Sequence, residues 1–199
     1  LRQLPRERRA ELMGVVHGVR VFTPMMLDAA RAHADYEGHI VNTASMAGLL
    51  GTPNMGAYNV SKHGVVALSE TLYQDLALVT GQITASVLCP YFVPTAIHQS
   101  HRNRPPLPSG RLQAPTRSQL ISQAMNEKAV TAGRVTAAQV AQLVFDALRE
   151  KRFYIYSHPQ ARGMVQARLE DVVHARNPGD PFAARPDIGA RLRKALRGG

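Results

Sequence analysis

The chain has 199 residues, of which 45% are apolar and 19% are charged, and its formal net charge at pH 7 is +10. These proportions suit one globular domain with a substantial core and exclude a disordered or collagen-like chain. No 18-residue window lacks both charge and proline, so we expect no segment that spans a bilayer. The single cysteine, Cys89, excludes an intramolecular disulfide and a cysteine-based zinc site. No secretory signal is visible, which favours the cytoplasm.

The basic excess consists mostly of arginine and gathers toward the two ends of the chain. We interpret it as solvated charge and expect no nucleic-acid partner, because no zinc-finger spacing, aromatic-basic repeat or heptad accompanies it. The eight histidines are scattered, with no pair on one helical face. We therefore expect no metal site.

Hydrophobic periodicity predicts the elements of the first half of the chain. Apolar residues recur at three- and four-residue steps from Leu12 onward, which indicates a long amphipathic helix. Proline cannot donate into a sheet ladder, so Pro90 marks the end of a strand. In chain order, the expected elements are a helix over 8–34, a strand over 39–44, a glycine-rich loop over 46–56, a helix over 57–79 and a strand over 83–89.

The second half opens with a proline-rich segment from 91 to about 115, a length that is typical of a lid or binding loop. Thr136 is expected to cap the N-terminus of a helix. Beyond 177 the composition predicts a basic tail rich in Pro, Gly and Arg. The other expected elements are a small helix over 117–128, a helix that ends near 148, a strand over 153–156 and a helix over 160–175.

Helices and short apolar strands therefore alternate, which predicts an α/β fold with a parallel sheet and helices on both faces. The strands are too few for a complete doubly wound domain. We expect a partial Rossmann-like sheet, namely the second half, with about three strands and flanking helices. No glycine-rich phosphate-binding turn follows any of these strands.

Tyr58 and Lys62 lie four residues apart near the start of the second long helix, on one helical face. A tyrosine has a pKa of about 10, and a neighbouring ammonium and the helix dipole lower it. Such a pair is common on helix surfaces, so other residues of the sequence must indicate whether it is catalytic. Ser45 follows the preceding strand, and a Pro-x-x-Val-x-Thr segment follows the next one. Because the carboxyl ends of parallel strands converge, these residues are expected to meet at one crevice.

In this combination the sequence resembles the classical short-chain dehydrogenase/reductase family. The resemblance covers residues 11–176, while 1–10 match nothing in it. It implies that Tyr58 is the general acid/base, that Lys62 lowers its pKa and contacts the nicotinamide ribose, and that Ser45 positions the substrate. It also implies that three further residues hold the nicotinamide: Pro90, Val93 and Thr95.

The resemblance further implies NAD or NADP as cofactor and an alcohol or ketone as substrate. A substrate loop would span 96–132. The helices over 8–34 and 57–79 match those through which family members dimerise, so a homo-oligomer is expected. The strand over 39–45 would be an open edge, because its second neighbour belongs to the part of the family fold with no counterpart here.

Three departures from the family bear on activity. The glycine-rich turn and the residue that selects NAD or NADP have no counterpart, so we expect the N-terminal cofactor-binding half to be missing. Glu11 stands where the family has an asparagine that supports a proton-relay water. Tyr91 replaces a glycine and is expected to crowd the nicotinamide site.

Two functions follow from these observations. The first is an oxidoreductase that transfers hydride between NAD(P) and an alcohol or carbonyl. The second is an inactive fragment that acts at most as an oligomerising partner. Pyrophosphate binding relies on the backbone N–H groups of the absent turn, which favours inactivity for this chain alone.

Overall fold

The computed structural model describes residues 6–97, 99 and 115–197. Parts of the sequence-predicted N-terminal segment and substrate loop, 1–5 and 100–114, lie outside the described residues. The elements are α1 (Arg6–Ala32), β1 (Gly38–Thr43), the 3₁₀ helix η1 (Met46–Gly48), α2 (Gly56–Val79), β2 (Ile83–Cys89), α3 (Arg117–Thr131), α4 (Ala137–Arg149), β3 (Tyr154–Tyr156), the 3₁₀ helix η3 (Pro159–Ala161), α5 (Arg162–Val173) and α6 (Pro186–Arg197).

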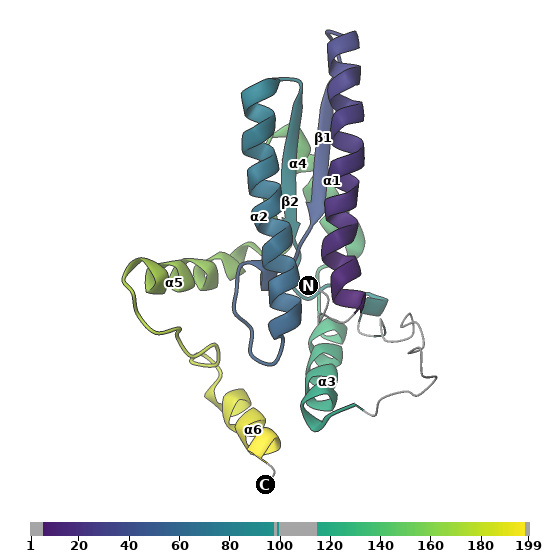
Figure 1. Cartoon of the computed structure of the whole chain (residues 1–199). Helices are drawn as coiled ribbons and strands as arrows, with labels where there is room; N and C mark the ends of the chain where they lie inside the picture. Colours follow the sequence, from purple (N-terminus) through teal and green to yellow (C-terminus); the bar gives the residue numbers. More distant parts are fainter. Residues whose placement is uncertain (1–5, 98, 100–114, 198–199) are drawn as a thin grey trace.

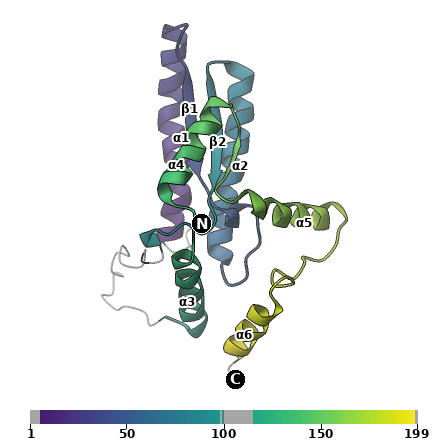
Figure 2. The same cartoon turned by 180° about the vertical axis from the view of Figure 1, so that it is seen from behind.

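Within the described residues, the three strands form one parallel sheet in the order β1-β2-β3. In the register, Ile40 lies opposite Ala85 and Leu88 lies opposite Ile155. Helices α1 and α2 cover one face of the sheet, and α4 covers the other (Figures 1 and 2). The predicted α/β architecture of about three strands with flanking helices is confirmed.

The central strand β2 is buried on both faces, which explains its almost continuous apolar sequence. Alternate residues such as Val87 and Ile83 pack toward α1 and α2. Leu88 packs against α4 and β3 on the opposite face. Burial raises the pKa of the Cys89 thiol to about 12, so this residue remains protonated and fills the core as a small apolar group.

A chain of polar contacts runs from β1 across β2 to Arg152, which precedes β3, on the face away from α2. The Ser86 hydroxyl donates to the carbonyl oxygen of Arg152 at 2.8 Å, and Nε2 of His39 lies 2.8 Å from the same hydroxyl. Because the single Ser86 proton goes to Arg152, His39 must donate through Nε2–H. Burial lowers the pKa of His39 below its usual value, so the neutral ring is favoured in the folded chain.

We therefore expect the free energy of unfolding to decrease as the pH falls below about 6.5. The unfolded chain takes up a proton on His39 more readily than the folded chain, so protonation favours unfolding. Urea melts between pH 7.5 and 5.5 measure this effect. His158, whose pKa burial also lowers, contributes to the same slope. His39→Gln should flatten the profile and His39→Gln/His158→Gln should flatten it further, whereas an unchanged slope would contradict the assignment.

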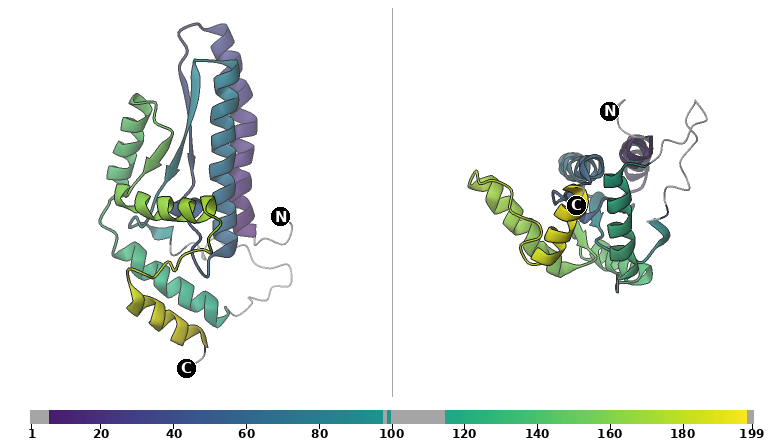
Figure 3. Two further views of the ribbon diagram at one scale, coloured as in Figure 1. Left: turned by 90° about the vertical axis from the view of Figure 1, so that its left-hand side faces the viewer. Right: turned by 90° about the horizontal axis from the view of Figure 1, so that it is seen from below.

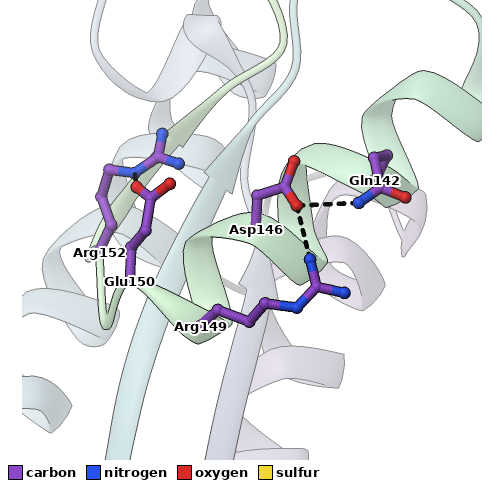
Figure 4. Close-up of polar contacts among 5 residues, drawn as sticks. All are labelled: Gln142, Asp146, Arg149, Glu150 and Arg152. Atoms are coloured by element: carbon purple, nitrogen blue, oxygen red, sulfur yellow. Dashed lines mark hydrogen bonds and ion pairs between the residues drawn. The ribbon is translucent and has the colours of Figure 1, made fainter.

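Polar contacts lie in the C-terminal half of α4 and just beyond it, as Figure 4 shows. Asp146 accepts hydrogen bonds from Gln142 and Arg149, each at 2.8 Å. Glu150 and Arg152 form an ion pair at 2.9 Å beyond the end of the helix. These groups are exposed, so they stabilise the fold only slightly. The predicted cap is confirmed, because the Thr136 side chain accepts from the backbone N–H of Gln139.

The structure differs from the sequence-based expectation beyond residue 177, where α6 occupies much of the predicted tail. Helix α6 packs against α3, as Figure 3 shows beneath the sheet. Its Leu192 is buried, and the ring of Phe182 lies against Gly189. This helix is hard to recognise in an arginine-rich sequence, because its apolar face is buried only through contact with α3, which ends more than 50 residues earlier in the chain.

Candidate active site

Ser45 lies directly after β1 and is tied to the end of β2. Its hydroxyl donates to the carbonyl oxygen of Pro90 at 3.4 Å, and the N–H of Met46 donates to the same oxygen at 2.9 Å. The Ser45 oxygen also accepts from the N–H of Ala47 and thereby caps η1. The structure thus brings Ser45 and Pro90 together at the carboxyl end of the sheet.

Tyr58 and Lys62 lie in the first two turns of α2, whose N-terminus is at the same end of the sheet (Figure 1). The Lys62 ammonium is 5.7 Å from the centre of the Tyr58 ring. It also donates to the carbonyl oxygen of Thr43 at 3.4 Å, two residues before Ser45. The ammonium therefore lies near both the Tyr58 ring and the end of β1.

The absence of a side chain at Gly48 allows the turn after Ser45 to pack closely against α2. A Cβ at position 48 would lie only 2.6 Å from the carbonyl oxygen of Lys62 and 2.9 Å from a methyl group of Val66. Only glycine allows this close approach of two backbones. Gly48 was expected only as a loop residue, and the structure shows that it sets the spacing between Ser45 and Lys62.

The segment after β2 carries the other predicted site residues. The N–H of Tyr91 donates to the Ser157 hydroxyl at 2.9 Å, which ties this segment to the residues after β3. Val93 is half-buried against the core beneath α4, and the Thr95 hydroxyl accepts from the N–H of Ile97 at 3.4 Å. The Tyr91 ring contacts His158 in an edge-on arrangement.

Glu11, on α1, contacts the helix that carries Tyr58. The buried Ser61 hydroxyl lies 3.3 Å from a carboxylate oxygen of Glu11 and 2.8 Å from the carbonyl oxygen of Tyr58. The hydroxyl has one proton, so these two acceptors compete for it. The shorter distance favours the Tyr58 carbonyl oxygen, and the Glu11 carboxylate is a second acceptor beside α2.

The described residues fit one end of a dinucleotide and not the other. Hydroxyl, ammonium and backbone groups gather where β1 and β2 end, and this donor set suits a nicotinamide and its ribose. No α-helix of the described part starts directly after β1 or β2 with a glycine-rich turn. Backbone N–H groups for a pyrophosphate are therefore not supplied there. Within the same residues, no cluster of metal-binding side chains occurs, and no helix is long and apolar enough to cross a bilayer.

Together, the parallel sheet and the helices on its two faces define a Rossmann-like α/β domain. A family model described as short chain dehydrogenase matches residues 6–106. The chain belongs to the short-chain dehydrogenase family.

Relatives of known structure and from curated collections agree with this assignment. A short-chain dehydrogenase/reductase from Burkholderia phymatum, crystallised with NAD, is 49% identical, with a TM-score of 0.79 over 87% of this chain and 59% of its own. The CLA biosynthesis dehydrogenase/reductase of Lactiplantibacillus plantarum is 32% identical over 81% of this chain and 55% of its own length. The 1-deoxy-11-beta-hydroxypentalenate dehydrogenase of Streptomyces exfoliatus is 32% identical over 85% of this chain and 53% of its own length. The chain thus spans somewhat more than half the length of these relatives.

Proposed function

We propose that this chain carries the proton-transfer half of a nicotinamide-dependent oxidoreductase that acts on an alcohol or carbonyl. The observation that carries the proposal is the position of the Lys62 ammonium, 5.7 Å from the Tyr58 ring and 3.4 Å from the Thr43 carbonyl oxygen. A positive charge at this point stabilises a phenolate on Tyr58. The phenol then exchanges a proton with a substrate oxygen near neutral pH.

Ser45 has the complementary role of orienting the substrate oxygen. Its hydroxyl bond to Pro90 is long, at 3.4 Å, so the proton can be redirected toward a ligand at small cost. Tyr58 gives its proton to a carbonyl oxygen in reduction and takes one from an alcohol in oxidation. The phenolate formed in reduction is stabilised by Lys62.

A nicotinamide cofactor, when bound, would accept or supply the hydride. Pro90, Val93 and Thr95 would contact the nicotinamide, and Lys62 its ribose. The NAD held by the Burkholderia phymatum relative supports a nicotinamide cofactor for this chain. The pyrophosphate needs backbone N–H groups from outside the described residues. We therefore propose that this chain alone binds the cofactor weakly.

Titration of the chain with NADH and NADPH by calorimetry tests this proposal. We expect little binding below millimolar cofactor. A chimera, in which the N-terminal half of the Burkholderia phymatum relative precedes residue 11 of this chain, should bind one of the two and reduce ketones. A chimera that folds but neither binds cofactor nor turns over would refute the proposal.

A second candidate function is an oligomerising partner without catalysis. Helix α1 carries the exposed apolar residues Val21, Phe22 and Met25. The groove between α1 and the open edge of β1 is apolar and encloses about 640 Å³, with Val19 and Ile40 among its lining residues. Surfaces of this kind recruit other chains, and the self-association experiment in the Discussion tests this candidate.

Glu11 provides a separate prediction about proton relay. An ionised carboxylate cannot donate a hydrogen bond, whereas an asparagine amide can. In the chimera, Glu11→Asn should raise kcat by about tenfold, while Glu11→Gln, which is neutral but longer, should raise it less. Activity of the 199-residue chain alone should not change. An increase in that chain would mean that it already binds its cofactor productively.

A further inference from the structure

One peptide group, the amide that joins Pro90 to Tyr91, links the ends of the three described strands. Its carbonyl oxygen, on Pro90, accepts from the Ser45 hydroxyl at 3.4 Å and from the N–H of Met46 at 2.9 Å, both of which follow β1. Its N–H, on Tyr91, donates to the hydroxyl of Ser157 at 2.9 Å, directly after β3. Because a peptide group is planar, these contacts fix one orientation for the whole group. Ser45 and Ser157 are therefore coupled through a single rigid amide.

The sheet itself does not hold this amide. The register between β1 and β2 ends with Thr43 opposite Leu88, and the register between β2 and β3 ends with Cys89 opposite Tyr156. The amide lies just beyond both ends. On the side of β3, the bond to the Ser157 hydroxyl thus takes the place of a backbone ladder bond.

Ser157 is buried, with 3% of its surface exposed, and its hydroxyl has a second partner. Nδ1 of His158 lies 2.8 Å from the Ser157 oxygen. The arrangement that satisfies all three groups has the oxygen accept from the Tyr91 N–H while the Ser157 hydroxyl donates to Nδ1. The Tyr91 and His158 rings pack edge-on with 5.8 Å between their centres, which keeps the imidazole in place. His158 therefore directs the Ser157 lone pairs toward Tyr91.

We propose that Ser157 is a positioning residue, which orients the Pro90–Tyr91 amide so that its carbonyl oxygen holds the Ser45 hydroxyl at the candidate site. This inference rests on the proposed function, in which Ser45 orients the substrate oxygen. An amide whose N–H donates a hydrogen bond is a better acceptor at its carbonyl oxygen. Loss of the Ser157 bond therefore both frees the amide to rotate and weakens its hold on Ser45.

Hydrogen–deuterium exchange of the 199-residue chain, resolved to single amides and measured without cofactor, tests the positioning. Ser157→Ala removes the acceptor of the Tyr91 N–H, so this amide should exchange about tenfold faster. Ser86→Ala is the matched control, because it removes another buried serine hydroxyl that pairs with a histidine, His39, earlier on β2. It should leave Tyr91 exchange unchanged. Equal Tyr91 exchange in the wild type and in Ser157→Ala would overturn the proposal.

Two conservative variants separate the hydroxyl from the volume of the side chain. Ser157→Cys keeps the volume closely and replaces the oxygen with a weak acceptor, so Tyr91 exchange should speed up as in Ser157→Ala. Ser157→Thr keeps the hydroxyl and should restore most of the protection. The cysteine variant also decides the question where the alanine variant does not fold. Slow exchange in Ser157→Cys, or fast exchange in a folded Ser157→Thr, would contradict the role of the hydroxyl.

Kinetics of the chimera test whether the positioning reaches the substrate. Ser157→Cys should lower kcat/KM for the ketone about tenfold and raise the KM, because a displaced Ser45 no longer orients the substrate oxygen. The affinity for NADH should change little, since Lys62 and Thr95 are untouched. A merely structural role would lower the fraction of folded enzyme, and hence kcat, without changing the KM. Ser86→Ala should show at most that second behaviour.

The two experiments distinguish this proposal from the function of the site. Faster Tyr91 exchange in Ser157→Cys, together with a folded chimera that does not bind NADH, would support the positioning of the amide and refute the proposed chemistry. A chimera that reduces ketones with the same KM in the parent and in Ser157→Cys would support the chemistry and refute the role of Ser157.

Discussion

Tyr58→Phe should lower kcat of the chimera by a factor of about 10² or more. The substitution keeps the aromatic ring and removes the only proton that the ring can exchange with a substrate oxygen. The Lys62 ammonium, 5.7 Å from the ring centre, then has no phenolate to stabilise. Ketone reduction monitored through NADH absorbance measures the loss, and the affinity for NADH should change little. Activity close to that of the parent chimera would remove Tyr58 from the mechanism.

Two further variants accompany Tyr58→Phe: Lys62→Arg tests the role of the ammonium, and Tyr73→Phe is the control for loss of a phenol. Arginine retains the positive charge but replaces a compact ammonium with a planar group, so the bond to the Thr43 carbonyl oxygen should be lost and activity should fall. Tyr73 lies later on α2 and packs edge-on against Phe153, away from the candidate site. Tyr73→Phe should leave kcat unchanged. An equal loss in Tyr73→Phe would show that the phenol effect is not specific to Tyr58.

The purified chain should be a dimer or larger species rather than a monomer. β1 lies at one edge of the sheet, and the exposed apolar residues of α1 lie next to that edge. Leu78 on α2 is 84% exposed and Phe22 on α1 is 59% exposed, and both helices are those expected to mediate dimerisation. Size-exclusion chromatography with light scattering should give a mass of at least twice 21.7 kDa.

Surface substitutions locate the interface. Phe22→Asp and Leu78→Asp place charges on α1 and α2 and should shift the chain toward monomer. Val173→Asp is the matched control, because Val173 is also exposed, at 77%, but lies on α5, away from the edge of β1. A sharp monomer peak for the unsubstituted chain, with cooperative unfolding, would contradict the prediction. Dissociation by Val173→Asp alone would place the interface on α5 instead.

Much of the fold could be predicted from short-range patterns. The sequence predicts the strand at 83–89 with its observed bounds, because Pro90 ends an apolar run of the kind that a central strand requires. The helix after Thr136 was predicted from its cap. Helix α6 was missed because its stability depends on contact with α3, and its own sequence is dominated by arginine.

The residues of the candidate site also fall into two groups: those that local sequence patterns predict and those whose role depends on a tertiary contact. Ser45, Tyr58 and Lys62 could be named from sequence because their spacing follows from the end of one strand and one helical face. Gly48 and Asn54 could not, since each acts through a tertiary contact. A glycine in a loop gives no sign that a backbone carbonyl lies 2.6 Å from its missing Cβ. Asn54, a polar residue in the loop before α2, likewise gives no sign in the sequence that its side-chain amide donates to the carbonyl oxygen of Ser118, 64 positions later.

The strand order also bears on how the chain folds during synthesis. Once Cys89 has been made, β2 can pair with β1, but its other edge remains unpaired until Tyr156 has been made. At about 5–20 residues per second, the ribosome needs roughly 3–13 s for this interval. Throughout that time β2, the most buried of the three described strands, exposes unpaired backbone groups. The nascent chain is therefore most prone to aggregate, and most in need of a chaperone, between these two points of translation.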